Sequence, residues 1–170
     1  MFKYLFAFVV LISAFVSGCA TDTISDVPEI DPALLIRPTL KGLKSVSLSV
    51  QDDRALELRK NSDGVKAKVL EAVKKVLTDV GVTVKDGAKD TLAMTVRDSE
   101  PIKEGHDKDG CVIVISRFAV NKMVYTAEDT GCWAVQSQGG AYLGSEIGHS
   151  YEIALNLMFK SMEKHLNEAK

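Results

Sequence analysis

The chain has 170 residues, of which 46% are hydrophobic and 26% are charged. This composition is typical of one globular domain, and it excludes a disordered chain, a collagen-like chain and a multi-pass membrane protein. Lysine and arginine number 21 against 23 aspartate and glutamate residues, which gives a formal net charge of −2. Because basic residues are not in surplus, we expect no nucleic-acid partner.

The first 18 residues differ from the rest of the chain. They contain 14 hydrophobic residues, one lysine and no acidic residue. The apolar run from Tyr4 to Val16 is shorter than the roughly 20 residues that a membrane-spanning helix needs, and its length is typical of a signal peptide. We therefore predict that residues 1–18 are an export signal.

The export signal ends in Val16-Ser17-Gly18-Cys19. This sequence resembles the lipobox of bacterial lipoproteins, in which lipid is attached to the cysteine sulfur and signal peptidase II cuts before that cysteine. The resemblance implies that Cys19 carries acyl chains such as palmitate. Ala20 follows, and lipoprotein sorting then implies an outer-membrane anchor with the body in the periplasm. The alternative is an uncleaved signal anchor, or an ordinary secretory signal with an incidental cysteine.

Residues 20–44 contain three of the four prolines and show no sustained periodicity. We expect residues 19–44 to comprise the lipidated Cys19 and a flexible tether, with an extended segment at Ala33–Ile36 that docks on the domain. Residues 45–170 are then expected to form a single periplasmic domain.

The first half of this domain predicts a strand and a helix. Residues 45–50 alternate serine with valine or leucine, which is the pattern of a half-buried strand. Residues 63–80 carry apolar side chains at helical spacing, and Gly81 follows where a glycine commonly ends a helix. Short strands at 82–84 and 91–97 are expected next.

The second half predicts two or three strands and a closing helix. Residues 111–115 are apolar at every position, which indicates a strand in the middle of the sheet. Asn121-Lys122 predicts a hairpin turn and Glu128–Gly131 a second one, so the sequence leaves open whether residues 111–137 form two strands or three. Apolar residues at helical spacing over 147–162 predict the last helix.

The element order of strand, helix, strands and helix predicts an α+β fold. We expect a two-layer sandwich in which two amphipathic helices cover one face of a mainly antiparallel sheet of about four or five strands.

The lipobox, the alternating strand, Asp52-Asp53-Arg54 and a helix ending at Gly81-Val82-Thr83-Val84 occur together here. In this combination the chain resembles the small uncharacterised outer-membrane lipoproteins of the YajG type, over most of residues 45–165. The resemblance implies no reaction. It implies a fold loosely shared with lipoprotein activators of cell-wall synthases and with auxiliary lipoproteins of envelope transporters.

Cys111 and Cys132 are the thiols that remain once Cys19 is lipidated. In an oxidising periplasm, an even pair on neighbouring strands is most simply a disulfide. The alternative is two buried thiols that act as small core residues. Neither cysteine lies in a Cys-x-x-Cys motif, which argues against a redox role.

Other residue clusters suggest chemistry only weakly. Asp52 and Asp53 are close carboxylates, but neighbours in a strand face opposite ways, so we expect local pairing with Arg54 or Arg59. His106, Asp107 and Asp109 could ligate a metal, yet the same letters are typical of a solvated turn, and no second ligand pair has zinc or EF-hand spacing. We expect no metal, no cofactor and no enzymatic activity.

Trp133 and Tyr142 lie near a glycine-rich segment and are candidate partner-binding residues, since exposed aromatic side chains often anchor a partner. Their alternative is ordinary partial burial in the sheet. The sequence thus favours a lipid-anchored accessory or scaffold protein that binds an unidentified envelope protein. The alternative is a periplasmic immunity or inhibitor protein that blocks a toxin or cell-wall hydrolase; a hydrolase without a recognisable motif is the third reading.

Overall fold

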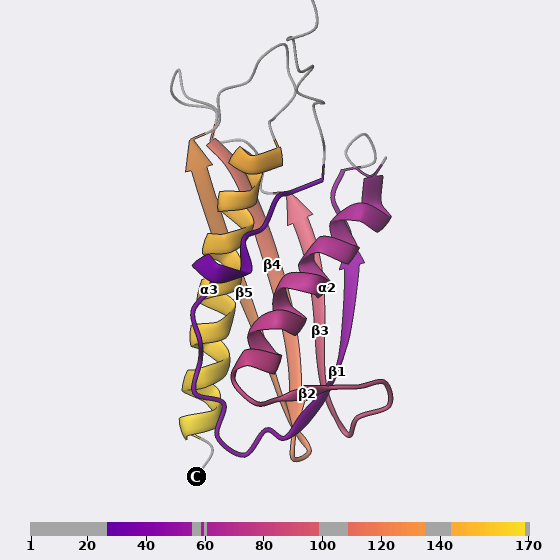
Figure 1. Cartoon of the computed structure of the whole chain (residues 1–170), viewed down its shortest axis with the longest axis vertical. Coiled ribbons are helices and arrows are strands. Elements are labelled where there is room, and N and C mark those ends of the chain that lie inside the picture. The colour runs from indigo at the N-terminus through magenta and orange to yellow at the C-terminus, as the bar shows by residue number, and fades with distance from the viewer. Residues whose placement is uncertain (1–26, 56–58, 60, 99–108, 135–143, 169–170) are drawn as a thin grey trace, which may run out of the picture.

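The computed structural model describes residues 27–168 except 56–58, 60, 99–108 and 135–143. In chain order its elements are the 3-10 helix η1 (Pro32–Leu34), β1 (Ser45–Asp52), α2 (Ser62–Asp79), β2 (Thr83–Val84), β3 (Asp90–Asp98), β4 (Asp109–Val120), β5 (Met123–Ala134) and α3 (Gly144–Glu168). The strands form one sheet in the order β2-β1-β3-β4-β5, and α2 and α3 both lie on one face of it (Figure 1). This arrangement confirms the predicted α+β class.

The sheet is mixed. β1 pairs in parallel with β2 and with β3, whereas the β3–β4 and β4–β5 pairs are antiparallel. The parallel pairs arise because α2 carries the chain back along the sheet after β1, so that the next strands start at the same end as β1. The hairpin-connected half is antiparallel, as the sequence predicts.

The two ends of the sheet differ in what they carry. β1, β3 and β5 end at one edge of the molecule, where β4, α2 and α3 begin (Figure 1). We call this the loop end. The opposite end carries the β4–β5 turn and the last turn of α3, and we call it the hairpin end.

The end of α2 follows the predicted signal. Gly81 has φ +82, a left-handed conformation that glycine adopts without a steric cost. The Gly81 N–H donates to the carbonyl of Thr78, and the Val82 N–H donates to the carbonyl of Leu77. These two bonds are those of a Schellman motif, which ends the helix and turns the chain toward β2.

Residues 109–134 form two long strands rather than three. Asn121 and Lys122, with φ 51 and 71, make the predicted two-residue hairpin turn. The second predicted turn, at Glu128–Gly131, is wrong because β5 runs straight through it. Gly131 has a different purpose: a Cβ there would lie 2.0 Å from the carbonyl oxygen of Ser150, so the glycine allows α3 to pack directly on the strand.

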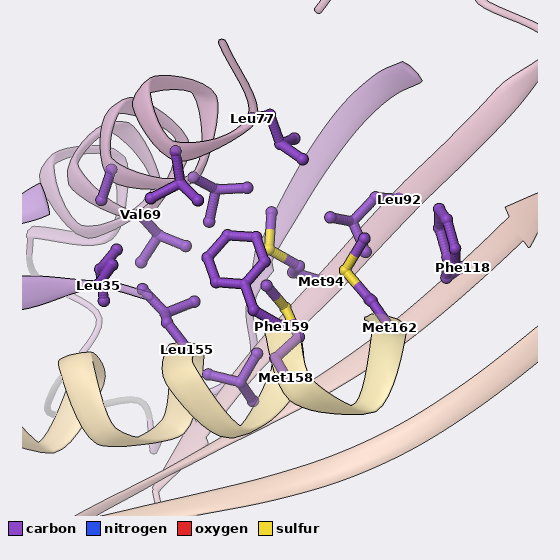
Figure 2. Close-up of a cluster of buried hydrophobic side chains, with 14 of the residues drawn as sticks. Leu35, Val69, Leu77, Leu92, Met94, Phe118, Leu155, Met158, Phe159 and Met162 are labelled. Carbon is purple, nitrogen blue, oxygen red and sulfur yellow. The ribbon is translucent and has the colours of Figure 1, made fainter. Parts of the chain in front are cut away.

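The hydrophobic core fills the space between the sheet and the two helices. Figure 2 shows side chains of α3, such as Phe159 and Met158, among those of α2 and of the sheet. Side chains from all three sources are fully or almost fully buried, among them Val69, Leu77, Leu92, Met94, Phe118, Leu155 and Met162.

Residues 27–44, which we call the strap, run along the helices from the loop end to the hairpin end (Figure 1). Leu35, Leu40 and Leu43 of the strap are buried, and Figure 2 shows Leu35 beside Val69 of α2 and Leu155 of α3. The expected docking of Ala33–Ile36 is confirmed, although this segment begins within the 3-10 helix η1. The rest of residues 27–44 is docked as well, so a flexible tether is wrong for this range. The physical reason is that these leucines complete the core that the two helices leave open between them.

The strap backbone is held by polar side chains of α3. The N–H of Asp31 donates to Glu152 at 2.8 Å, and the N–H of Ile36 donates to Asn156 at 2.7 Å. Further down, the N–H of Thr39 donates to Glu163 at 3.1 Å. An extended chain outside a sheet needs such partners for its backbone donors, and α3 supplies them.

Two neighbouring leucines of the strap offer a matched test of its docking. Leu35→Ala should lower the free energy of unfolding by about 2–5 kcal/mol, since it opens a cavity in the core. Leu34→Ala should change it by less than about 0.5 kcal/mol, because Leu34 is 55% exposed. Urea unfolding followed by circular dichroism measures both, and equal small effects would show that the strap contributes nothing to stability.

Candidate functional site

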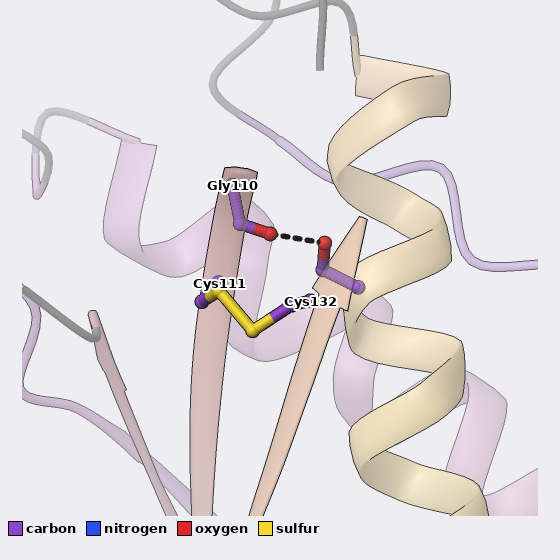
Figure 3. The surroundings of a disulfide bond; sticks show 4 residues. Gly110, Cys111 and Cys132 are labelled. Carbon is purple, nitrogen blue, oxygen red and sulfur yellow. Dashed lines mark hydrogen bonds between the residues drawn. A yellow bond between two sulfur atoms is a disulfide. The ribbon is translucent and has the colours of Figure 1, made fainter. Parts of the chain in front are cut away.

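The loop end carries the predicted disulfide. Cys111 and Cys132 are directly opposite each other on β4 and β5, with their Cα atoms 4.1 Å apart, and the structure joins them in a disulfide (Figure 3). The neighbouring Gly110 carbonyl accepts a hydrogen bond from the hydroxyl of Ser150 on α3. These links hold the edge strand β5, β4 and the start of α3 together at this end.

Asp52 faces the helices at the end of β1 and forms a buried ion pair. Its Oδ1 and Oδ2 accept from Nε and Nη2 of Arg54, each at 2.8 Å, and neither side chain is more than 7% exposed. Burial raises the pKa of Asp52, but hydrogen bonds from Arg54 and Ser62 and the charge of Arg54 outweigh it, so its pKa lies below the ordinary value. The pair therefore ties the β1–α2 connection to the sheet.

Asp53 points the other way and pairs with different residues. Its Oδ1 lies 3.3 Å from Nη2 of Arg59, and its Oδ2 lies 3.2 Å from Nε of Arg97. Asp52 and Asp53 thus do not share a site, as the alternation of strand side chains predicts. Both carboxylates are used to hold the chain after β1.

Trp133 lies near the end of β5 and remains 46% exposed. Its ring is tilted against that of His149 in α3, with centroids 4.8 Å apart. His149 Nδ1 in turn lies 2.8 Å from Oε2 of Glu152, whose other carboxylate oxygen accepts from the strap. The exposed tryptophan is thereby connected to the docking of the strap through one histidine and one buried carboxylate.

An open pocket of ≈ 350 Å³ lies beside this cluster. The strap, α2 and α3 line it with Glu29, Ile30, Asp31, Leu34, Lys68, His149 and Glu152. Glu152 is buried and already holds two partners, and Oδ1 of Asp31 accepts from the N–H of Ala33. The polar groups around the pocket are thus engaged mainly in docking the strap.

Several predicted site residues lie outside the described part of the chain, namely Cys19, His106, Asp107 and Tyr142. Within the described residues, no group of three or more His, Cys, Asp or Glu side chains is placed to hold a metal ion. None of the helices described is both long and apolar enough to cross a membrane.

The cluster of Trp133, His149 and Glu152 and the polar stripe of α3 escaped the sequence analysis. Glu152 and Asn156 are four residues apart and Glu163 is seven residues further on, so all three lie on one side of the helix. That stripe borders the apolar face of α3. It is the signal from which the part of α3 that holds the docked segment could have been predicted.

Asp129 of β5 faces α3 with an unpaired carboxylate oxygen. Its Oδ1 accepts from the hydroxyl of Ser161 at 3.3 Å, while Oδ2 is buried without a hydrogen-bond partner. Burial raises the pKa of Asp129, and the Ser161 hydrogen bond offsets this only in part. Ionised Asp129 is therefore a source of instability in the β5–α3 contact.

Comparison with known proteins shows the fold alone. No family model matches the sequence, and no curated protein matches it. Protein XCC0632 from Xanthomonas campestris, of the family DUF330, has a similar structure, with a TM-score of 0.52 and 9% identity over 85% of this chain and 98% of that one. This chain thus shares its fold with that bacterial protein. At 9% identity the similarity says nothing about function.

Two further structures are similar at lower scores. Lipoprotein GNA1162 from Neisseria meningitidis has a TM-score of 0.41 and 10% identity over 74% of this chain and 99% of that one. Protein CT253 from Chlamydia trachomatis has a TM-score of 0.42 and 10% identity over 75% of this chain and 95% of that one.

The Asp52–Arg54 pair predicts a pH-dependent stability. Asp52→Asn should cost about 3–5 kcal/mol near pH 7, because it removes the charge that neutralises buried Arg54. Since the folded-state pKa of Asp52 is lowered, this contribution is fully present above the unfolded value of about 3.8 and is lost as the pH falls through the folded value. Urea unfolding at several pH values should show that the free energies of unfolding of the wild type and of Asp52→Asn become equal in acid. A constant difference down to the lowest pH would contradict the ion-pair explanation.

Replacing Asp129 should stabilise the protein, whereas replacing Asp52 should destabilise it. Asp129→Asn should raise the melting temperature at neutral pH, because it removes a buried charge with an unpaired oxygen. The gain should shrink as the pH falls through the raised pKa, where the wild-type carboxyl takes up a proton and becomes neutral itself. Thermal melts of both proteins across this range measure the effect, with the exposed Glu128→Gln as the control. A variant that melts below the wild type at pH 7 would show that the carboxylate is stabilising.

Proposed function

We propose that this protein is a periplasmic lipoprotein, anchored in the outer membrane through Cys19, that acts as a non-catalytic accessory or scaffold protein of a cell-envelope complex. Its resemblance to lipoproteins of the YajG type belongs to the same proposal. The mechanism is tethering, which confines the domain to a thin layer above the bilayer and raises its effective concentration for partners in that layer. A modest intrinsic affinity is then sufficient.

One observation carries this proposal. The strap is packed on the helices from Val27 onward, and Val27 lies only eight residues after the lipobox cysteine. Eight residues span at most about 28 Å even when fully extended. A lipid on Cys19 would therefore hold the folded domain close to the membrane, and a close hold is what tethering requires.

The chemistry of the loop end supports a binding role. Asp52 and Asp53 are paired with arginines, and His149 is paired with Glu152. These two carboxylates and this histidine are thus engaged in contacts that hold the fold. Trp133, by contrast, leaves a large apolar surface exposed at the same end, where it is available for a non-covalent contact with another envelope component, protein or lipid.

The anchor is tested by labelling cells with radioactive palmitate. Wild-type protein should incorporate the label and fractionate with the outer membrane, and Cys19→Ser should lose both, because the serine hydroxyl does not accept the lipid. Cys111→Ser/Cys132→Ser is the matched control: it removes cysteines but should keep the label. Unchanged maturation and fractionation of Cys19→Ser would refute the anchor.

The accessory role is tested by crosslinking in intact cells. Wild-type protein should form a discrete crosslinked species with an envelope protein, and Cys19→Ser secreted to the same level should lose about tenfold or more of that yield, because the tether no longer concentrates it. Full yield without the lipid would contradict tethering. Potent inhibition of a toxin or wall hydrolase by the purified protein would instead support the inhibitor alternative.

A further inference from the structure

The place where the strap begins determines which part of the domain lies nearest to an N-terminal anchor. Val27 packs on α2, where a Cβ added at Gly64 would lie 2.8 Å from its Cγ2. Two residues later the strap crosses α3, where a Cβ added at Gly148 would lie 2.0 Å from the carbonyl oxygen of Glu29. Both contacts are in the first turns of the helices, so the chain enters the fold at the loop end.

The length of chain before Val27 is short compared with the domain. From Cys19 to Val27 the backbone reaches at most about 28 Å, and a flexible chain of this length averages about 16 Å. The strap crosses α3 at Gly148, and from there to Glu168 the helix is about 30 Å long. Turning the domain so that its hairpin end faced the anchor would place Val27 about 30 Å from the bilayer, which is about twice the average reach of this chain and slightly more than its fully extended length.

The loop end also carries a side chain suited to a lipid surface. Trp133 is the only tryptophan of the chain and is 46% exposed there, on the strand that the disulfide ties to β4. Tryptophan combines a large apolar ring with one N–H donor, and it is enriched where a membrane meets water for that reason. The contact with His149 holds the ring at this end.

We propose that the loop end of the domain faces the bilayer and that Trp133 contacts the lipid interface. This inference rests on the proposed anchor at Cys19. It assigns the exposed tryptophan to lipid and leaves the hairpin end, with the exposed Met123 and Val124, projecting away from the membrane toward other envelope components.

The single tryptophan makes a direct test available. Mature lipidated protein, beginning at Cys19, is reconstituted into phosphatidylcholine vesicles that contain lipids brominated near the head group or deep in the acyl chains. The emission of Trp133 should fall about twofold or more with the shallow bromines and less with the deep ones, as expected of an interfacial ring. The mass of each sample shows independently whether the acyl chains are present, so a failed anchor is distinguished from a failed orientation.

A matched variant moves the probe to the other end. Trp133→Phe combined with Val124→Trp places the only tryptophan at the hairpin end, at a position that is 51% exposed in the wild type. Its emission should be insensitive to brominated lipid. Equal quenching at both positions would mean that the domain lies flat on the bilayer, and unquenched Trp133 in fully acylated protein would assign this side chain to a protein partner. Either result overturns the proposal.

Discussion

The docking of the strap on α3 is the contact on which the rest of the structure depends. Three backbone N–H groups of an extended segment are satisfied by Glu152, Asn156 and Glu163, while Leu35 closes the core between the helices. A segment so held can neither leave the domain nor slide along it without exposing leucines and leaving backbone donors unpaired. The strap is therefore part of the folded domain, although it contains three of the four prolines of the chain.

This docking also links the core to the surface features of the loop end. The same Glu152 that receives the strap positions His149, and His149 contacts the ring of Trp133. On the other side of α3, Ser150 and the close contact at Gly131 attach the helix to β4 and β5 beside the disulfide. The entry point of the chain and its exposed tryptophan are thus linked through α3.

The proposed function depends on the positions of the chain entry and of the exposed tryptophan, and it invokes no catalytic residues. Charged residues at the end of β1 hold the connection to α2, and His149 of α3 pairs with the carboxylate of Glu152. The chain from a lipidated Cys19 to Val27 would be short, and Val27 joins the domain at the loop end. Together these two features would present the loop end to the membrane and the hairpin end to the periplasm. Orientation of this kind is useful to a protein that works by contact, because it reduces the rotational freedom lost on binding.

Local patterns were enough to predict many features. The alternation in residues 45–50, the spacing of valines up to Gly81, the Asn121-Lys122 turn and the Cys111–Cys132 pair each depend on neighbours in sequence or on adjacent strands. The parallel pairing of β1, the docking of the strap beyond the expected segment Ala33–Ile36 and the straight path of β5 through Glu128–Gly131 were not predictable in this way. Each of these is decided by contacts between residues far apart in the chain, such as Gly131 with Ser150 or Asp31 with Glu152. The sequence by itself determined the α+β elements and most of their ends, because those are set by local polarity and backbone preference. Only the tertiary structure decided that residues 27–44, with their prolines, complete the core, because burial depends on the surface that the two helices leave uncovered.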